Sequence, residues 1–279
     1  MKPFSIAALQ LDLEYSDNFN LVAEKTYQVA KRYSWVQMIV MSELAVGGSS
    51  RSLEYSLEKQ LPKFQDISKE LGIWYVPGSF YDHVNGEVKN VAPVISPEGD
   101  LVTTCTKTYP FMPYEKGISP GVEPCVFEVP KVGFFGVHIC YDLWFPETSR
   151  ALAMNGAQVI LHPSLTDTCD RDEEKIMARA TAIQQQCYYI DVNAGGKQGR
   201  GLSIALGPEG EVLNESSEGE EVVLIEVEVD RVDRVRKRGI KGLGQPLKSF
   251  RDNPEPFVKK ISNDNYLKNL GVLEIPEKE

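Results

Sequence analysis

The sequence predicts an α/β fold in which two sheets lie face to face. Apolar runs of strand length alternate with amphipathic runs of helix length over most of the 279 residues. The two halves of the chain have similar content, and each contains a hairpin turn with the sequence Pro-Glu-Gly, at residues 97–99 and 208–210. This internal similarity favours a duplicated arrangement with facing sheets.

The chain is predicted to form one domain. No stretch rich in Pro, Ser and Gly separates the two halves, so we expect a single domain over residues 1–250. Residues 251–279 contain several Pro and polar residues. We expect this C-terminal segment to be a tail that is extended or lies at a subunit contact.

The first half contains a β-α-β-α-β series followed by a hairpin. Continuous or alternating apolar runs indicate the strands, and apolar residues at helical spacing indicate the helices. The predicted strands are 4–11, 36–41, 73–78, 91–95 and 101–106, and the predicted helices are 18–33 and 52–71.

The second half repeats this content. Its predicted strands are 132–140, 159–162, 187–193, 202–205 and 222–229, and its predicted helices are 146–155 and 172–186. In the second helix, Ile176, Ala180 and Ile183 share one apolar face. Basic side chains gather after the last strand, where we expect a solvated face or a subunit contact. They are Arg231, Arg234, Arg236, Lys237, Arg238 and Lys241.

The composition is that of a globular protein that acts on small molecules. Hydrophobic residues make up 42% of the chain and charged residues 25%, which is enough to form a sizeable core. The formal net charge of -10 disfavours nucleic acid and anionic lipid as partners. We see no apolar run long enough to cross a membrane and no targeting segment, so we expect a cytoplasmic protein.

The cysteines do not indicate a disulfide framework or a metal site. The five cysteines are scattered and form no Cys-x-x-Cys pair, so we expect free thiols in a reducing compartment. They are Cys105, Cys125, Cys140, Cys169 and Cys187.

Three reactive side chains stand at the ends of predicted strands. Glu43 follows strand 36–41, Lys107 follows strand 101–106, and Cys140 ends strand 132–140. Side chains at the carboxyl ends of strands in α/β folds project into a common crevice. Each alone has a purely structural explanation, but together they form a chemically complete set. A cation lowers the pKa of a thiol, and a carboxylate can transfer protons.

Histidine is the usual base for a cysteine nucleophile, but none of the three histidines fits that role well. His138 shares a strand face with Cys140, yet same-face neighbours lie about 7 Å apart, beyond hydrogen-bond reach. His83 stands in a turn-like segment and is expected at the surface. His162, at another strand end, could line the pocket.

At this point the residues resemble a known family, the nitrilase or carbon-nitrogen hydrolase superfamily. Residues 138–147, with the sequence HICYDLWFPE, are similar to the nucleophile motif of that family. Residues 41–44 resemble its strand-end glutamate motif, and residues 106–110 resemble its lysine motif. Glu115 is similar to a second glutamate present in many members. The resemblance runs from about residue 4 to about residue 250.

The resemblance implies a four-layer α-β-β-α sandwich that pairs with a second subunit across a helical face. It also implies an amidase mechanism that needs no metal or cofactor. Glu43 would take the proton of Cys140, and the thiolate would attack an amide carbonyl. Lys107 and the backbone N–H of Tyr141 would stabilise the oxyanion, while Glu115 would orient Lys107 or the substrate. By the same resemblance, Glu147 and Arg179 would hold the buried turn and network around the nucleophile.

The substrate is less defined. Trp144 stands where many amidase-like members carry Arg, which resembles the branch that hydrolyses carbamoyl amines and favours uncharged or cationic groups. Further pocket candidates are Tyr109, Phe111, Tyr114, Tyr141, His162 and Ser164. Expected partners are a small amide, carbamoyl compound or nitrile and a second copy of the chain, in a homodimer or larger oligomer. An amidase or carbamoylase is favoured. A true nitrilase and a non-catalytic binding protein remain the alternatives.

Overall fold

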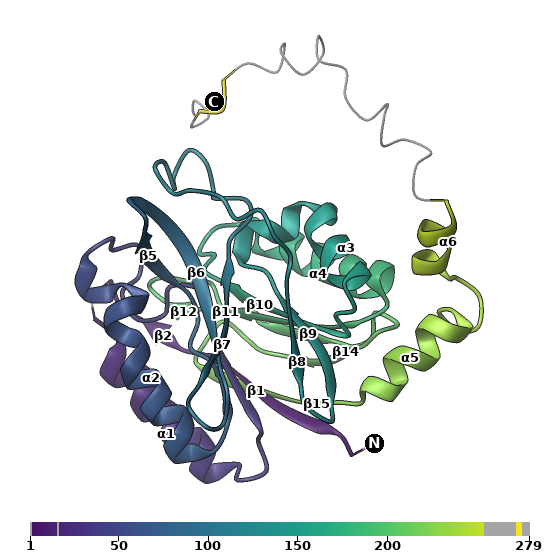
Figure 1. Ribbon diagram of the computed structural model, residues 1–279, viewed down its shortest axis with the longest axis horizontal. Helices are drawn as coiled ribbons and strands as arrows, with labels where there is room; N and C mark the ends of the chain where they lie inside the picture. The colour runs from purple at the N-terminus through teal and green to yellow at the C-terminus, as the bar shows by residue number, and fades with distance from the viewer. Residues whose placement is uncertain (1, 16, 254–271, 275–279) are drawn as a thin grey trace.

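The computed structural model describes residues 2–15, 17–253 and 272–274, and within these residues two large sheets lie between two pairs of helices (Figure 1). Helices α1 (Phe19–Arg32) and α2 (Leu57–Leu71) cover the first sheet. Helices α3 (Pro146–Met154) and α4 (Arg171–Gln185) cover the second. The predicted four-layer α-β-β-α sandwich is confirmed.

The first sheet has the strand order β15-β1-β3-β4-β6-β5, and β7 pairs with β6. Strands β1, β3 and β4 are parallel, as expected for the predicted β-α-β-α-β series. The bounds are β1 Phe4–Gln10, β3 Met38–Met41, β4 Trp74–Val76, β5 Phe80–Val84, β6 Glu87–Ile95, β7 Leu101–Thr106 and β15 Glu221–Val227.

The second sheet has the order β14-β13-β11-β10-β9-β8, with β9, β10 and β11 parallel. A short parallel ladder joins β2 (Asp12–Leu13) to β12 (Gly195–Gly196). The bounds are β8 Cys125–Val129, β9 Gly133–Val137, β10 Val159–Ser164, β11 Tyr188–Asn193, β13 Ile204–Leu206 and β14 Val212–Glu215.

Alternate side chains of one strand fill two different layers. In β1, Ile6 and Ala8 pack between the two sheets, whereas Ala7 and Leu9 pack against α1 and α2. Because both faces of the strand are buried, its sequence reads as a continuous apolar run. The same two-sided burial explains why the central strands could be predicted.

The structure contains a strand after the second Pro-Glu-Gly turn that was not predicted. The turn at Gly207–Gly210 joins β13 to β14, and β15 then crosses to the first sheet, where it pairs antiparallel with β1. Strands β5 and β8 were not predicted, because β5 is half exposed and β8 lies at a sheet edge, where burial leaves a weaker pattern.

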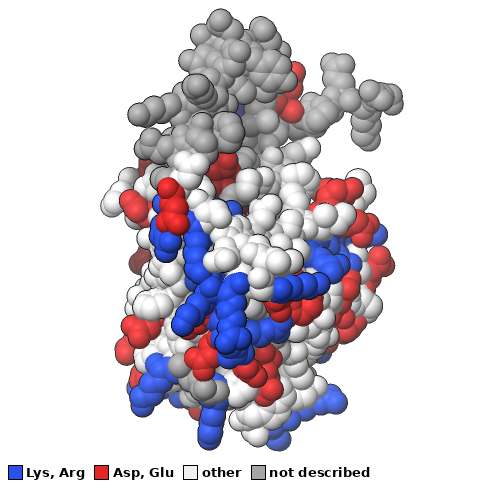
Figure 2. Space-filling model, turned by 90° about the vertical axis from the view of Figure 1, so that its right-hand side faces the viewer, with Lys and Arg blue, Asp and Glu red and all other residues white. Residues whose placement is uncertain are grey.

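The basic cluster after β15 forms helix α5 (Val229–Arg238), which was not predicted. Val229, Val232 and Val235 form its buried face, and most of its basic side chains remain on the surface. Figure 2 shows Lys and Arg gathered on this side of the molecule, with Asp and Glu around them. Arg236 is an exception, because it packs under the helix and donates to the carbonyl of Gln186.

A short helix lies at the boundary between the expected domain and the expected tail. Helix α6 (Pro246–Asp252) spans the proposed boundary at residue 250, so the first residues of the segment are helical and not extended. Most of residues 251–279 lie outside the described part of the chain. No helix among the described residues is long and apolar enough to span a bilayer.

Candidate active site

Both sheets contribute to one candidate site, at the ends of strands β3, β7 and β9. Glu43 follows β3, Lys107 follows β7, and Cys140 begins the short 3-10 helix η2 (Cys140–Trp144) after β9. The backbone N–H of Glu43 donates to the carbonyl of Ser164 at the end of β10, with an N···O distance of 3.1 Å. This bond ties the end of the first sheet to the end of the second.

Lys107 lies between two carboxylates. Its Nζ is 2.9 Å from Oε1 of Glu43 and 2.8 Å from Oε2 of Glu115, and all three side chains are buried. Burial lowers the pKa of Lys107, but the carboxylate of Glu43 leads the opposing interactions, and the net pKa lies well above the usual range. Lys107 is therefore a fixed ammonium, and two of its three N–H groups are already committed.

Two residues that the sequence analysis did not single out hold this arrangement. Asn90 on β6 donates its amide to Oε1 of Glu43 at 2.8 Å and to Oε1 of Glu115 at 3.2 Å. The hydroxyl of Tyr81 donates to Oε1 of Glu115 at 2.8 Å. An Asn inside an apolar strand is the sequence signal that could have identified Asn90. The side chain is fully buried, and a buried amide needs hydrogen-bond partners.

The nucleophile candidate stands on strained backbone. Cys140 has a φ of 46°, in the left-handed region that a non-glycine residue rarely adopts. This conformation turns the chain sharply from the strand into η2. Contacts around the turn must therefore hold it in place.

Burial and a neighbouring carboxylate govern the pKa of the Cys140 thiol. Burial raises its pKa well above the usual range, and the Glu43 carboxylate raises it further. Lys107 acts in the opposite direction without reversing the shift. Lys107 thus lowers the pKa of the thiol, as expected of a neighbouring cation, but burial and Glu43 outweigh it, a balance that the sequence could not reveal.

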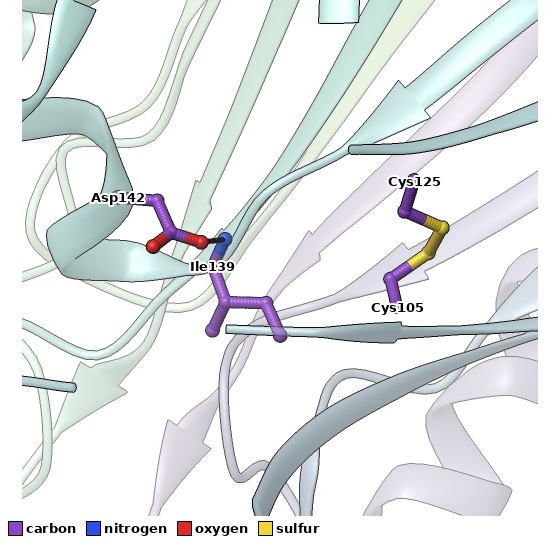
Figure 3. Close-up of a disulfide and its surroundings, with 4 residues drawn as sticks. All are labelled: Cys105, Cys125, Ile139 and Asp142. Carbon is purple, nitrogen blue, oxygen red and sulfur yellow. Dashed lines mark hydrogen bonds between the residues drawn. A yellow bond between two sulfur atoms is a disulfide. The ribbon is translucent and has the colours of Figure 1, made fainter. Parts of the chain in front are cut away.

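Asp142 fixes the turn after the nucleophile. Its Oδ2 accepts from the backbone N–H of Ile139 at 2.9 Å, as Figure 3 shows, and its Oδ1 accepts from the N–H of Tyr109 at 2.7 Å. Burial raises the pKa of Asp142 to about 6, against the effect of these two hydrogen bonds. The side chain thus joins the cysteine turn to the segment that begins with Lys107.

Cys105 and Cys125 form a disulfide, which contradicts the expectation of five free thiols. The bond links β7 of the first sheet to β8 of the second, close to the Ile139–Asp142 turn (Figure 3). It closes a loop over a sequence separation of 20 residues that contains both Lys107 and Glu115. The sequence could not reveal it, because the two strands meet only after the sheets have stacked. Cys169 and Cys187 are free, as is Cys140.

The predicted pocket residues separate into two groups. Tyr141 and Trp144 belong to an aromatic cluster beside the nucleophile, in which Tyr141 packs against Phe111, and Phe111 stacks on Tyr114 with ring centroids 4.8 Å apart. Tyr109 and Phe145, stacked at 3.6 Å, continue the cluster. Ser164 and His162 are fully buried behind the nucleophile.

Two residues carried over from the resemblance do not have the expected surroundings. Arg179 is exposed and donates to the carbonyl of Gly210 at 2.7 Å, so its assignment to the buried network is wrong. Glu147 is exposed and makes no hydrogen bond or ion pair within the described residues. The hydroxyl of Thr148 instead lies 2.8 Å from the carbonyl oxygens of Asp142 and Phe145 and holds the turn.

The buried network under the nucleophile centres on Arg171, which the sequence analysis did not single out. Arg171 donates to Glu174 at 3.0 Å and also to Asp191, and all three side chains are almost fully buried. Burial lowers the pKa of Arg171, but Asp191 and Glu174 raise it, with a net increase. The apolar face predicted for α4 is wrong, because Ile176 and Ile183 face solvent. The buried face of the helix contains Ala178 and Ala182 instead.

The remaining histidines lie outside the reacting groups. His138 is buried, and its Nε2 lies 2.8 Å from the hydroxyl of Tyr189. His83 lies on β5, with Nε2 3.2 Å from the carbonyl oxygen of Arg51. Within the described residues, no group of three or more His, Cys, Asp and Glu side chains is arranged to hold a metal ion.

The four-layer α-β-β-α sandwich places a glutamate, a lysine and a cysteine just after strands β3, β7 and β9, and a second glutamate in the loop between β7 and β8. The sequence matches the carbon-nitrogen hydrolase family over residues 5–237, and the chain belongs to that family. The predicted superfamily is thereby confirmed, as is the expectation of a hydrolytic enzyme that acts on carbon-nitrogen bonds.

Individual relatives are distant. The chain is 26% identical over 252 residues to 2-oxoglutaramate amidase from Bacillus subtilis, covering 84% of this chain and 94% of the relative. It is 29% identical over 269 residues to a nitrilase from Pyrococcus abyssi, covering 88% and 93%.

Solved structures share the fold. A carbon-nitrogen hydrolase from Helicobacter pylori matches with a TM-score of 0.79 at 22% identity, covering 93% of this chain and 98% of the other. Nit3 from Saccharomyces cerevisiae, a member of the nitrilase superfamily, matches with a TM-score of 0.76 at 21% identity, covering 93% and 97%.

Proposed function

We propose that the protein is an amidase that hydrolyses a small amide or carbamoyl compound and releases ammonia through a thioester on Cys140. The proposal rests above all on the carboxylate of Glu43. Its Oε1 accepts hydrogen bonds from Lys107 and Asn90, whereas its Oε2 has no hydrogen-bond partner among the described residues. Glu43 is thus held rigidly by one oxygen and has the other available as a base.

We derive both steps of the reaction, formation of the thioester and its hydrolysis, from this arrangement. Oε2 of Glu43 accepts the proton of the Cys140 thiol as the sulfur bonds to the amide carbon, so the buried thiol need not ionise beforehand. The carbonyl π electrons move to oxygen and form a tetrahedral intermediate. Glu43 then passes the proton to the leaving nitrogen, ammonia departs, and a thioester remains. Glu43 next takes a proton from a water molecule as its oxygen bonds to the acyl carbon. The C–S bond then breaks, the acid leaves, and Glu43 returns the proton to the Cys140 sulfur.

Two donors support the developing oxyanion. The third N–H of Lys107 is free of the two carboxylates, and the backbone N–H of Tyr141 has no acceptor among the described residues. Donors of this kind are each worth about 3 kcal/mol of transition-state stabilisation in comparable sites. Glu115 holds Lys107 in position.

The aromatic cluster favours a substrate without a free carboxylate. Tyr109, Phe111 and Tyr114 are 36%, 39% and 56% exposed, so their rings are available to an entering molecule. Aromatic faces attract apolar and cationic groups. The buried cations Lys107 and Arg171 are already paired with carboxylates. We therefore propose neutral or cationic amides and carbamoyl amines over dicarboxylate amides, although the B. subtilis relative acts on 2-oxoglutaramate.

Ammonia release from a substrate panel tests the proposal. The panel contains butyramide, an aromatic amide, a carbamoyl amine, 2-oxoglutaramate and the matching nitriles. We expect turnover of the first three. Turnover of nitriles without amides would favour the nitrilase alternative, which the similarity to the P. abyssi nitrilase also raises. Preference for 2-oxoglutaramate would contradict the role given to the aromatic cluster.

Intact-mass measurement distinguishes an enzyme from a binding protein on the same fold. We expect an acyl adduct when the substrate is quenched in acid during turnover, and its loss in Cys140→Ala. Cys187→Ala, which changes a second buried free cysteine, is the matched control and should keep the adduct. A protein that binds these compounds and forms no adduct would be a non-catalytic relative.

We also propose that the protein is a homodimer. Met154 on α3 and Ile176 on α4 are 43% and 71% exposed, and both helices lie on the outer face of the second sheet (Figure 1). Apolar side chains gathered on an outer helical face are typical of subunit contacts. Light scattering should give the mass of a dimer for the protein and of a monomer for Ile176→Glu. A monomer at all concentrations would contradict the proposal.

We propose a cytoplasmic location, although the expectation of five free thiols, on which it partly rested, is wrong. The disulfide between Cys105 and Cys125 is unusual in a reducing compartment. Thiol counting on protein isolated from the cytosol under alkylating conditions tests whether that bond is present there.

A further inference from the structure

His162 contacts the nucleophile from behind. Its Nε2 lies 2.9 Å from the backbone carbonyl oxygen of Cys140, and its Nδ1 lies 2.8 Å from Oδ1 of Asp191. His162 and Asp191 are both fully buried. The imidazole therefore has no access to a substrate, and its two nitrogens are both committed to the protein.

The hydrogen-bond partners require both nitrogens of His162 to carry a proton. A carbonyl oxygen only accepts, so Nε2 must donate to Cys140. Burial raises the pKa of Asp191, but Arg171 and His162 lower it more, so this side chain is a carboxylate that also accepts. Burial lowers the pKa of His162, yet Asp191 and the Cys140 carbonyl raise it above its usual value. Both hydrogen bonds therefore favour the doubly protonated ring, an imidazolium.

The bonded carbonyl belongs to the peptide group that supplies an oxyanion donor. In a trans peptide, the C=O of Cys140 and the N–H of Tyr141 are rigidly antiparallel. A donor fixed on the carbonyl side therefore fixes the direction of the N–H on the other side. It also polarises the peptide, since hydrogen bonds in a chain strengthen one another, and a charged donor does so more than a neutral one.

We propose that His162 is a positioning residue that orients and polarises the Cys140–Tyr141 peptide so that the Tyr141 N–H stabilises the oxyanion. This inference rests on the proposed function, because it assumes a tetrahedral intermediate at this cysteine. This role explains why a buried, protonated His162 lies under the nucleophile. Cys140 has a left-handed φ of 46°, so its peptide group needs contacts that hold it in place. The energy that holds this backbone conformation comes in part from the His162 bond.

The surrounding network keeps the imidazolium in place. Asp191, which faces Nδ1, is held in turn by Arg171. Arg171 also donates to the backbone carbonyls of Gly201 and Leu202 at 3.1 and 3.0 Å, so it is anchored to the chain on the far side. The network therefore forms a continuous support from the loop before β13 to the nucleophile peptide.

Two substitutions at His162 separate the donor from its charge. His162→Leu removes the bond to the Cys140 carbonyl. His162→Gln places an amide N–H near the position of Nε2 and removes the charge. The matched control is His138→Gln, because His138 is also buried, its ring lies 4.8 Å from that of His162, and it makes no bond to the Cys140 carbonyl.

The measurement compares two reactions of the same sulfur. Butyraldehyde adds to Cys140 so that an S–C bond forms and the carbonyl π bond breaks. The thiol proton passes to Glu43, and the aldehyde oxygen occupies the oxyanion position. Iodoacetamide alkylates the sulfur by displacing iodide and forms no oxyanion. Peptide mass spectrometry at Cys140 gives the alkylation rate, and protection against alkylation gives the affinity for butyraldehyde.

We expect His162→Leu to weaken butyraldehyde binding and kcat by about 10- to 100-fold, less than the loss of a whole oxyanion donor, which is about 100- to 1000-fold. KM and the alkylation rate should change little. His162→Gln should lie between His162→Leu and the unaltered protein, and His138→Gln should match the unaltered protein in both reactions.

Two outcomes would overturn the inference. One is unchanged butyraldehyde affinity in both His162 variants, and the other is a fall in alkylation in step with the fall in affinity, which would indicate general disruption of the site. If His162→Leu does not fold, His162→Gln decides alone. A protein that hydrolyses none of the panel compounds would contradict the proposed function, whereas the comparison of the two sulfur reactions would still be readable.

Discussion

Replacing Glu43 by glutamine should change two reactions of Cys140 in opposite directions. The amide introduced by Glu43→Gln keeps an oxygen to accept from Asn90 and Lys107 but loses the negative charge and the base. Amide hydrolysis should fall by about 100- to 10,000-fold, which is the usual contribution of a positioned general base. Alkylation of the same cysteine by iodoacetamide should become faster.

The reason lies in the charges around the sulfur. At the observed Nζ···Oε1 distance of 2.9 Å, the attraction between Lys107 and Glu43 is about 6 kcal/mol at an effective dielectric constant of about 20. In the unaltered protein this carboxylate both neutralises the cation and raises the pKa of the Cys140 thiol. Removing it lowers the thiol pKa, so we expect at least about tenfold more thiolate at neutral pH.

The assay is peptide mass spectrometry at Cys140 after timed alkylation between pH 5 and pH 10. The midpoint of the rate profile should move to lower pH in Glu43→Gln, because loss of a negative neighbour favours the charged form of the thiol. Glu147→Gln, which alters an exposed carboxylate without hydrogen-bond partners among the described residues, should leave both reactions unchanged. Slower alkylation in Glu43→Gln would refute the reasoning, since Glu43 would then activate the resting thiol.

Three further predictions concern the supports of the site. Asp142→Asn leaves one of two backbone N–H groups without an acceptor, and should lower the free energy of unfolding by about 1–3 kcal/mol in urea titrations and reduce kcat. Arg171→Ala removes the guanidinium that pairs with the buried carboxylates of Glu174 and Asp191, and should lower the free energy of unfolding by about 3–5 kcal/mol. The exposed Arg179→Ala should not move the unfolding midpoint. Replacing both disulfide cysteines by Ser opens a loop with a sequence separation of 20 and should lower the free energy of unfolding by about 3 kcal/mol. It should also lower activity, because that loop carries Lys107 and Glu115. Cys169→Ser, which changes a free cysteine, should leave both stability and activity unchanged.

The sequence by itself determined the layers and pointed to the candidate reacting groups. Strands such as β1 and β3 are buried on both faces, so their apolar runs are unmistakable, and they end at residues whose chemistry differs sharply from that of the strand. The motif around Cys140 is local, so the nucleophile candidate, the turn after it and the family could be predicted without knowing which strands are neighbours.

Only the tertiary structure decided the electrostatic state of the site. The effect of Lys107 on the pKa of the thiol depends on how many carboxylates reach the same ammonium. The two carboxylates, Glu43 and Glu115, come from separate segments of the chain, and Asn90 on a third holds Glu43 in place. The disulfide, the supporting Arg171 and the buried His162 likewise depend on contacts between sheets and helices. Sequence patterns report the burial of single elements, whereas a pKa depends on distances between elements, and these are set only when the layers pack.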